Sequence, residues 1–245
     1  MDNNIQNNKV TIFISCLVDT FYPNVGESMV KVLRNLGVEV DFLEDQTCCG
    51  QPAFNSGYQD EAKELAARFL DIFDQVNYIV CPSGSCVTMV KIFYKELLKY
   101  DQHKMTQLKR VISKTYEFSE FIVNVLGVTD VGASYDGIVT YHDSCHLLRE
   151  LGINKEPREL IKSVRGIEFR EMELHDACCG FGGAFSIKFS DVSVSMLNEK
   201  IDCILNSGAN TVVANDMGCL MNIGGVISKR NLSIRVLHIA ELLAN

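Results

Sequence analysis

The sequence predicts an α/β protein made of two duplicated Rossmann-like domains, each with a parallel sheet, related by pseudo-two-fold symmetry. Short β-branched and aromatic runs alternate with helical segments, which is typical of parallel strands joined by right-handed crossovers. A Cys-Cys-Gly triplet occurs twice, at positions 48–50 and 178–180. Segments 77–86 and 210–219 align without gaps, and both end in cysteine. Duplication of one cysteine-bearing unit explains all these observations.

In the first half, each expected strand is followed by a cysteine or by a helix that leads to the next strand. The helix over 60–76 has the strongest pattern, because its apolar residues recur at helical spacing on one face. We expect strands at 10–15, 38–43 and 78–81, and helices at 27–36, at 60–76, from near Cys86, and in segments up to about Leu126.

The second half repeats this order. Strands are expected at 138–142, 167–172 and 211–214, and each again precedes a cysteine or the second triplet. A repeat of roughly 125 residues is too long for a solenoid of short units. We therefore expect a first cysteine-rich domain over 1–130 and a second over 131–245.

Composition narrows the classes of function. The chain has 245 residues, 47% of them hydrophobic, and a formal charge of −8. That charge argues against nucleic acid and against an anionic membrane surface as partners. No run of residues approaches the length of a membrane span, and the polar N-terminus does not resemble a secretion signal. We therefore expect a protein of a reducing compartment, where clustered cysteines hold metal or do redox work more often than they form disulfides; the chain has ten.

Eight of the ten cysteines recur in both halves. Each half has one cysteine, then 31 or 32 residues, then the adjacent cysteines of the triplet, then 36 or 39 residues, then another cysteine. These cysteines follow strand ends, and ligands of parallel sheets bind at the carboxyl ends of strands, so a metal site is expected there in each half. The predicted ligands are Cys16, Cys48, Cys49 and Cys86 in the first half, and Cys145, Cys178, Cys179 and Cys219 in the second.

Four thiolates in each half suit either an iron–sulfur cluster or zinc. Structural zinc sites usually contain Cys-x-x-Cys pairs, which this chain lacks. Adjacent cysteines reach different irons of a polynuclear cluster more easily than they surround one ion. The sequence therefore favours iron–sulfur, one or two clusters in the chain, with zinc open as the metal of one domain. No ferredoxin-type cysteine run is present, so any relay of cubane clusters belongs to a partner chain.

The motifs at 48–58, at 142–146 (His-Asp-Ser-Cys-His) and at 178–186 resemble the cysteine-rich "CCG" domain family. Within that family, the chain is most similar to the lactate utilisation protein A family, and the resemblance spans its whole length. It implies a cytoplasmic iron–sulfur protein that acts with a ferredoxin-like subunit and a third subunit. Together these would oxidise L-lactate, a small 2-hydroxy acid, to pyruvate. The resemblance alone suggests the substrate.

One feature makes the cluster type an open question. Relatives in the family include the iron–sulfur subunit of glycolate oxidase and the disulfide-reducing subunit of heterodisulfide reductase. In the latter, the domain ends in Cys-x-x-Cys, and five cysteines hold a non-cubane cluster. Here Ser83 and Asp216 stand where the first cysteine of that pair would be. A four-cysteine [4Fe–4S] cluster is the simpler expectation. Cys81 and Asp216 are candidates for extra ligands, whereas Cys203 is expected to be an ordinary core residue.

His142, His146 and Arg149 surround Cys145, and this polar trio is not part of the duplicated scheme. They could bind a carboxylate substrate, donate hydrogen bonds to cluster sulfurs or move protons, and so are the tentative catalytic residues. Ordinary structural support of Cys145 is the competing interpretation. Their asymmetry makes the second site the better candidate for chemistry.

The sequence leaves three functions open. The first is an iron–sulfur oxidoreductase subunit that takes part in oxidation of L-lactate with partner subunits and so permits growth on lactate. The second is a zinc-stabilised assembly module of such a complex. The third is a thiol–disulfide reductase like the heterodisulfide relative, which the residues at positions 83 and 216 disfavour.

Overall fold

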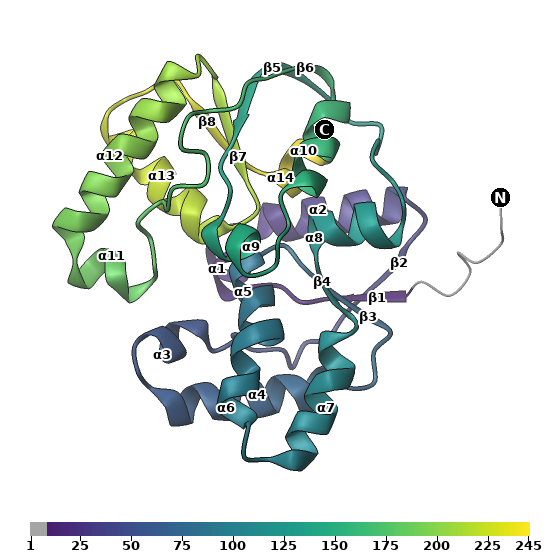
Figure 1. The fold of residues 1–245 in the computed structure, drawn as a ribbon. Coiled ribbons are helices and arrows are strands. Elements are labelled where there is room, and N and C mark those ends of the chain that lie inside the picture. Colours follow the sequence, from purple (N-terminus) through teal and green to yellow (C-terminus); the bar gives the residue numbers. More distant parts are fainter. Residues whose placement is uncertain (1–8) are drawn as a thin grey trace.

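The computed structural model describes residues 9–245 and contains two four-stranded sheets whose strands are all parallel (Figure 1). The first sheet has the order β2-β1-β3-β4 and the second has the order β6-β5-β7-β8, so the two orders are equivalent. The strands are β1 (Lys9–Ile12), β2 (Glu39–Phe42), β3 (Tyr78–Cys81), β4 (Thr115–Glu117), β5 (Ser134–Tyr141), β6 (Arg165–Phe169), β7 (Thr211–Ala214) and β8 (Arg235–His238). The predicted duplicated α/β fold is confirmed.

Helices connect the strands in both halves, and the first half has more helical segments than the second. Those of the first half are α1 (Cys16–Phe21), α2 (Pro23–Asn35), α3 (Gln51–Asn55), α4 (Gln59–Phe73), α5 (Gly84–Thr88), the π-helical turn η2 (Met89–Phe93), α6 (Tyr94–Leu98), α7 (Gln102–Ile112), α8 (Phe118–Glu120) and the π-helical turn η3 (Phe121–Val125). Those of the second half are α9 (Cys145–Arg149), α10 (Lys155–Ser163), α11 (Ala184–Lys188), α12 (Ser190–Asn206), α13 (Met217–Lys229) and α14 (Ile239–Leu243).

Sequence patterns missed the last strand of each half. We expected helix throughout the end of the first half, but β4 pairs there with β3, and β8 pairs in the same way with β7. Both are short edge strands, of three and four residues, so they carry no alternating pattern that could be recognised. Helix α2 also begins earlier than expected, because Pro23 occupies its first turn, where a missing N–H costs nothing.

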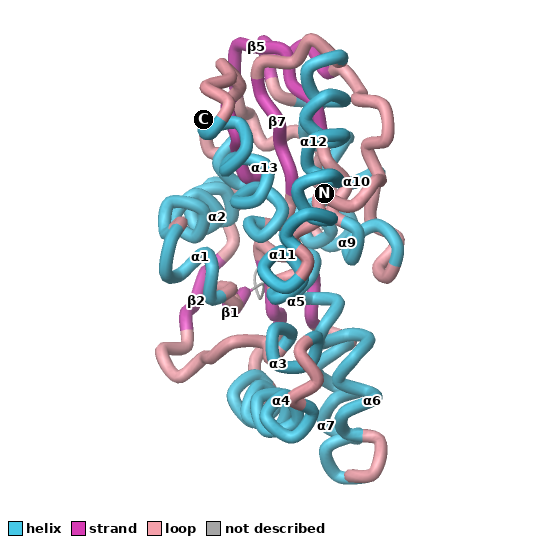
Figure 2. The backbone as a smooth tube through the Cα atoms, turned by 90° about the vertical axis from the view of Figure 1, so that its left-hand side faces the viewer, coloured by secondary structure: helices cyan, strands magenta, loops and turns pink. Residues whose placement is uncertain are grey.

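The described residues form three apolar cores, one between the halves and one on the outer side of each half. Figure 2 shows α4, α6 and α7 gathered at the lower end of the molecule. The central core lies between the sheets and is filled by α2 and α8 of the first half and α10 and α14 of the second. One outer core packs α4, α6 and α7 on the far face of the first sheet. The other packs α12 and α13 on the second sheet. Since the central core takes side chains from both halves, the halves are packed as one body.

Equivalent residues make reciprocal contacts across the boundary between the halves, as a pseudo-two-fold arrangement requires. Glu117 ends β4 and caps α8, and it accepts a hydrogen bond from the Asn215 side chain at 3.0 Å. His238 ends β8 and caps α14, and its Nε2 lies 3.0 Å from the carbonyl oxygen of Pro82. Pro82 and Asn215 are themselves equivalent, each being the first residue after the third strand of its half.

Within residues 9–245, none of the helices is both long enough and apolar enough to cross a membrane.

Candidate metal centre between the two halves

All eight repeated cysteines line one cavity between the halves, with a volume of about 400 Å³. We expected a separate site at the strand ends of each half. Instead residues that come after the carboxyl ends of β1, β3, β5 and β7 all line this space. Helix α5 of the first half packs against α9 of the second (Figure 1). Close packing requires Gly84, since a Cβ there would lie 2.7 Å from the Leu147 side chain. The docking of the halves therefore merges two half-sites into one chamber.

In the first half, loops and helix starts bring four thiols together. Cys16 is the first residue of α1, and Cys86 lies in the first turn of α5. Cys48 and Cys49 lie in the loop that enters α3. The Sγ atoms of Cys16 and Cys48 are 3.9 Å apart, and those of Cys49 and Cys86 are 3.4 Å apart. All are free thiols, so the four sulfurs are gathered without a disulfide.

The second half has the same arrangement with one addition. Cys145 begins α9, Cys219 lies in the first turn of α13, and Cys178 and Cys179 lie in the loop before α11. The Sγ atoms of Cys179 and Cys219 and a ring nitrogen of His142 all lie within 4.8 Å of one another, and all three residues are buried. The second half thus places a nitrogen donor next to its thiols.

Glycine is required after each cysteine pair. Gly50 and Gly180 have φ of +84° and +76°, a backbone conformation that L side chains avoid. A Cβ on Gly180 would also lie 2.9 Å from the backbone oxygen of Ser193. The Gly50 N–H donates to Cys48 Sγ at 3.4 Å, and the Gly180 N–H donates to Cys178 Sγ at 3.4 Å. The tight turn therefore splays the paired cysteines and supplies a donor that stabilises a thiolate.

Two cysteines of the triplets are the most acidic thiols. Hydrogen bonds from Cys16 and Cys49 lower the pKa of Cys48 to about 3, and the bond between Cys16 and Cys48 raises the pKa of Cys16. In the second half, hydrogen bonds from Cys145 and Cys179 lower the pKa of Cys178 to about 2. One thiolate in each half is therefore ionised at neutral pH, and a thiolate is the form that binds metal.

The cysteines at the helix starts form a second ionised pair. A hydrogen bond from Cys49 is the main cause that lowers the pKa of Cys86 to about 5. Cys179 likewise lowers the pKa of Cys219 to about 6. Both lie at helix N-termini, whose partial positive charge also favours anions. Each half therefore holds two thiolates and two thiols, and the thiols would release their protons when a cation binds.

The three polar residues around Cys145 do not act as a group. His142 is fully buried beside Cys179 and Cys219. His146 lines the cavity, with its Nδ1 3.7 Å from the Cys145 sulfur. Arg149 is exposed, and its guanidinium donates to the backbone oxygen of Asp176, 3.1 Å away, rather than to a carboxylate. As catalytic residues they remain predictions, and only the histidines adjoin the sulfurs.

Asp216 lines the cavity but is occupied by hydrogen bonds that join the halves. Its Oδ2 accepts from the Ser83 hydroxyl at 3.2 Å and from the Ser85 N–H at 2.9 Å. Its Oδ1 accepts from the Gly218 N–H at 3.1 Å. One carboxylate therefore caps α5 of the first half and α13 of the second. This tie is its observed role, and a role as metal ligand remains a prediction.

The two cysteines without counterparts lie outside the cavity lining. Cys81 ends β3 and is fully buried, and burial raises its pKa, which disfavours a thiolate. Its hydrogen bond to Cys86 places it behind a predicted ligand. Cys203 lies in α12 and packs in the outer core of the second half.

A buried charge network that sequence reasoning missed supports the second half-site. Asp143 is 1% exposed, and Arg158 donates to both of its carboxylate oxygens, at 2.9 and 2.7 Å. Nδ1 of His175 lies 2.7 Å from the same carboxylate. These contacts hold the turn between β5 and Cys145. The aspartate stands in the His-Asp-Ser-Cys-His motif, but its partners are too distant in sequence to be recognised there.

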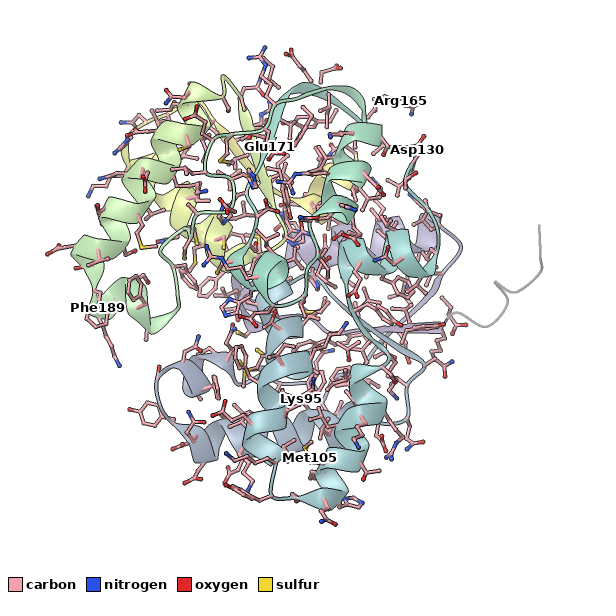
Figure 3. The ribbon with its side chains drawn as sticks, in the orientation of Figure 1. Lys95, Met105, Asp130, Arg165, Glu171 and Phe189 are labelled. Carbon is pink, nitrogen blue, oxygen red and sulfur yellow. The ribbon has the colours of Figure 1, made fainter. Side chains whose placement is uncertain are left out.

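The cavity lining carries no Lys or Arg among the described residues. Besides the cysteines, its ionisable groups are His146 and Asp216, and its apolar side chains include Leu17, Phe181 and Phe185. The ring of Phe185 packs against that of Phe189, with centroids 5.5 Å apart, and Phe189 points away from the molecule (Figure 3). Such a lining suits sulfur ligands and a low dielectric better than it suits a carboxylate, which needs a cationic partner.

Comparisons with known proteins agree with the repeat. The family model of the cysteine-rich domain, CCG, matches residues 10–91 and 139–224. "Lactate utilization protein A" of Bacillus subtilis (strain 168) is 47% identical over 235 residues, which cover 96% of this chain and 98% of that protein. "Lactate utilization protein A 2" of Bacillus cereus (strain 03BB102) is 47% identical over 236 residues, with the same coverage of both chains.

A solved structure shows the same fold. A hypothetical protein from Helicobacter pylori superposes with a TM-score of 0.68 at 10% identity, covering 97% of this chain and 48% of that one. At this identity the likeness concerns the fold alone, and this chain spans about half of that protein.

Proposed function

This chain belongs to the cysteine-rich (CCG) domain family, and we propose that it is an iron–sulfur subunit of a system that oxidises L-lactate to pyruvate. The assignment to lactate rests on the names of relatives that match nearly the whole chain. We propose a cytoplasmic complex in which a ferredoxin-like subunit and a third subunit are the partners.

The convergence of eight thiols in one cavity is the observation that carries this proposal. The donor set fits sulfur-ligated iron, because thiolates, glycine N–H groups and helix N-termini all point at the same space. The orphaned ring of His142 also implies a partner that protein atoms do not supply. The predicted ligands are the eight repeated cysteines.

A bound cluster would supply one-electron chemistry, and the residues of this chain would hold and insulate it. Cys49, Cys86, Cys179 and Cys219 are buried, whereas Cys16 is exposed. A centre held between them is shielded on one side and open toward a partner on the other. Because no Lys or Arg among the described residues lines the cavity, we propose that a partner subunit binds the 2-hydroxy acid and that this chain passes on its electrons.

The test is metal analysis of the full chain purified without oxygen. We expect a brown protein that contains iron and acid-labile sulfide. Cys48→Ser and Cys178→Ser should each lower the iron content, whereas Cys203→Ser, a buried cysteine outside the cavity, should not. A colourless protein that contains zinc alone would contradict the proposal.

Zinc is the second candidate, and one observation favours it for the second half. Cys179, Cys219 and His142 form a compact set of sulfur and nitrogen donors of the kind that holds structural zinc. A chain with zinc there would act as an assembly module without redox chemistry. The same analysis separates the two, because such a module would contain zinc without sulfide.

A further inference from the structure

His142 is the least satisfied polar side chain near the cysteines. It follows β5 and is 0% exposed. Neither Nδ1 nor Nε2 has a hydrogen-bond partner. Besides Cys179, the nearby ring helps to lower the pKa of the Cys219 thiol, so its nitrogen faces that sulfur. Burying an imidazole whose nitrogens lack hydrogen-bond partners lowers the free energy of unfolding, because the lost hydration is not replaced by protein contacts.

The position has a structural counterpart in the first half, and that counterpart is Phe13. The backbone N–H of Phe13 donates to the Val80 carbonyl at 2.9 Å, and the N–H of His142 donates to the Val213 carbonyl at 2.9 Å. Phe13 packs edge-on against Phe69, with ring centroids 4.9 Å apart. An aromatic ring thus suffices for packing at this place in the fold. The second half carries nitrogen donors there that packing does not need.

The ring also has sulfur neighbours at the distance of ligands that share a metal. One nitrogen of His142 and the Sγ atoms of Cys179 and Cys219 lie within 4.8 Å of one another, close enough for all three to bind one ion or one cluster iron. The three side chains come from the end of β5, from the triplet loop and from the start of α13, so local sequence alone cannot bring them together.

We propose that His142 is a nitrogen ligand of the metal centre in the second half, so that the two halves hold chemically different centres. The first half offers four thiols, and the second offers four thiols and an imidazole. This inference rests on the proposed function in one respect, that the cavity holds a metal or cluster. It replaces the role of His142 as a catalytic group with that of a ligand.

The test labels histidine with ¹⁵N in the full chain, purified without oxygen. Pulsed electron paramagnetic resonance would detect nitrogen coupled to an iron cluster, and X-ray absorption at the zinc edge would detect nitrogen bound to zinc. We expect directly bound nitrogen at one of these metals in the wild type. His142→Phe, which copies the first half, should lose it. His146→Leu, which copies Leu17 of the first half, should retain it.

Each outcome is decisive. Nitrogen that is lost in His142→Phe and kept in His146→Leu supports the inference. A wild-type protein that contains metal with sulfur as its only ligands overturns it while leaving the proposed function standing. A protein that binds no metal overturns both. If His142→Phe misfolds, as circular dichroism would show, His146→Leu still decides, because loss of the nitrogen signal in that variant would overturn the inference and its retention would support it.

Discussion

Glu117 and His238 occupy equivalent caps, and their buried side chains should make stability depend on pH in opposite directions. Burial raises the pKa of Glu117 to about 7 and lowers the pKa of His238 to about 4. Folding therefore favours a proton on Glu117 and disfavours one on His238. Both side chains are 0% exposed, so solvent screening weakens neither effect.

The sign for each group follows from linkage. The stabilisation associated with protonated Glu117 is fully present below its ordinary pKa of 4.5 and is lost as pH rises through 7. That of neutral His238 is present above its ordinary pKa of 6.5 and is lost as pH falls through 4. At about 1.36 kcal/mol for each pH unit between the two pKa values, each contributes about 3 kcal/mol. The two slopes nearly cancel in the wild type.

Glu117→Gln should remove the pH dependence of stability that Glu117 contributes and so reveal that of His238. Its free energy of unfolding, relative to wild type, should rise by about 3 kcal/mol between pH 4.5 and pH 7.5. A constant offset of about 1 kcal/mol is expected as well, because the Gln amide would face the Asn215 amide as donor against donor. Urea unfolding at each pH measures the difference, and groups common to both proteins cancel in it.

His238→Gln is the matched variant, and its difference from wild type should change with pH in the opposite direction. It should become relatively more stable as pH falls from 6.5 to 4. A Glu117→Gln difference that stays constant across the range would refute the reasoning, since it would mean that the buried carboxylate titrates near its ordinary value.

Three further variants test the site. Gly180→Ala should lower the free energy of unfolding by about 3 kcal/mol and Gly50→Ala by about 2 kcal/mol. Both substitutions strain a left-handed backbone, but only Gly180→Ala places a Cβ 2.9 Å from the Ser193 oxygen. Equal losses in urea unfolding would contradict this. Asp216→Ala should lower the free energy of unfolding by about 2 kcal/mol, because it removes the cap of two helices, and Asp216→Asn should lower it less. Thermal unfolding measures the difference. No loss would mean that the hydrogen bonds of Asp216 to both halves do not stabilise the fold. Cys178→Ser should reduce metal content while Cys203→Ser leaves it unchanged, and equal effects would place the metal elsewhere.

Much of the fold could be predicted because its signals are local. The helix over 60–76 was recognisable from the spacing of its apolar residues, and α4 buries that face in the outer core. The triplets predicted strand-end loops, and the positive φ of Gly50 and Gly180 explains why glycine follows each pair. Strands β4 and β8 were missed because three or four residues at a sheet edge are held by pairing, which no local pattern records.

The site itself could be predicted only in part. Counting cysteines across the repeat identified eight candidate ligands and separated them from Cys81 and Cys203. It did not reveal the hydrogen bonds of Asp216 to both halves or the ion pair of Asp143 with Arg158, because these partners are set by tertiary packing.

The sequence by itself determined that this protein has two copies of one cysteine-bearing α/β unit, because repeats and helical periodicity are properties of the chain. Only the tertiary structure decided that the two half-sites share one cavity. That follows from the central core between the sheets, where α2 and α8 meet α10 and α14. The same packing buries His142 beside Cys179 and Cys219 and leaves its ring without a protein partner. Duplication made the halves alike, and their docking placed both sets of cysteines around one cavity.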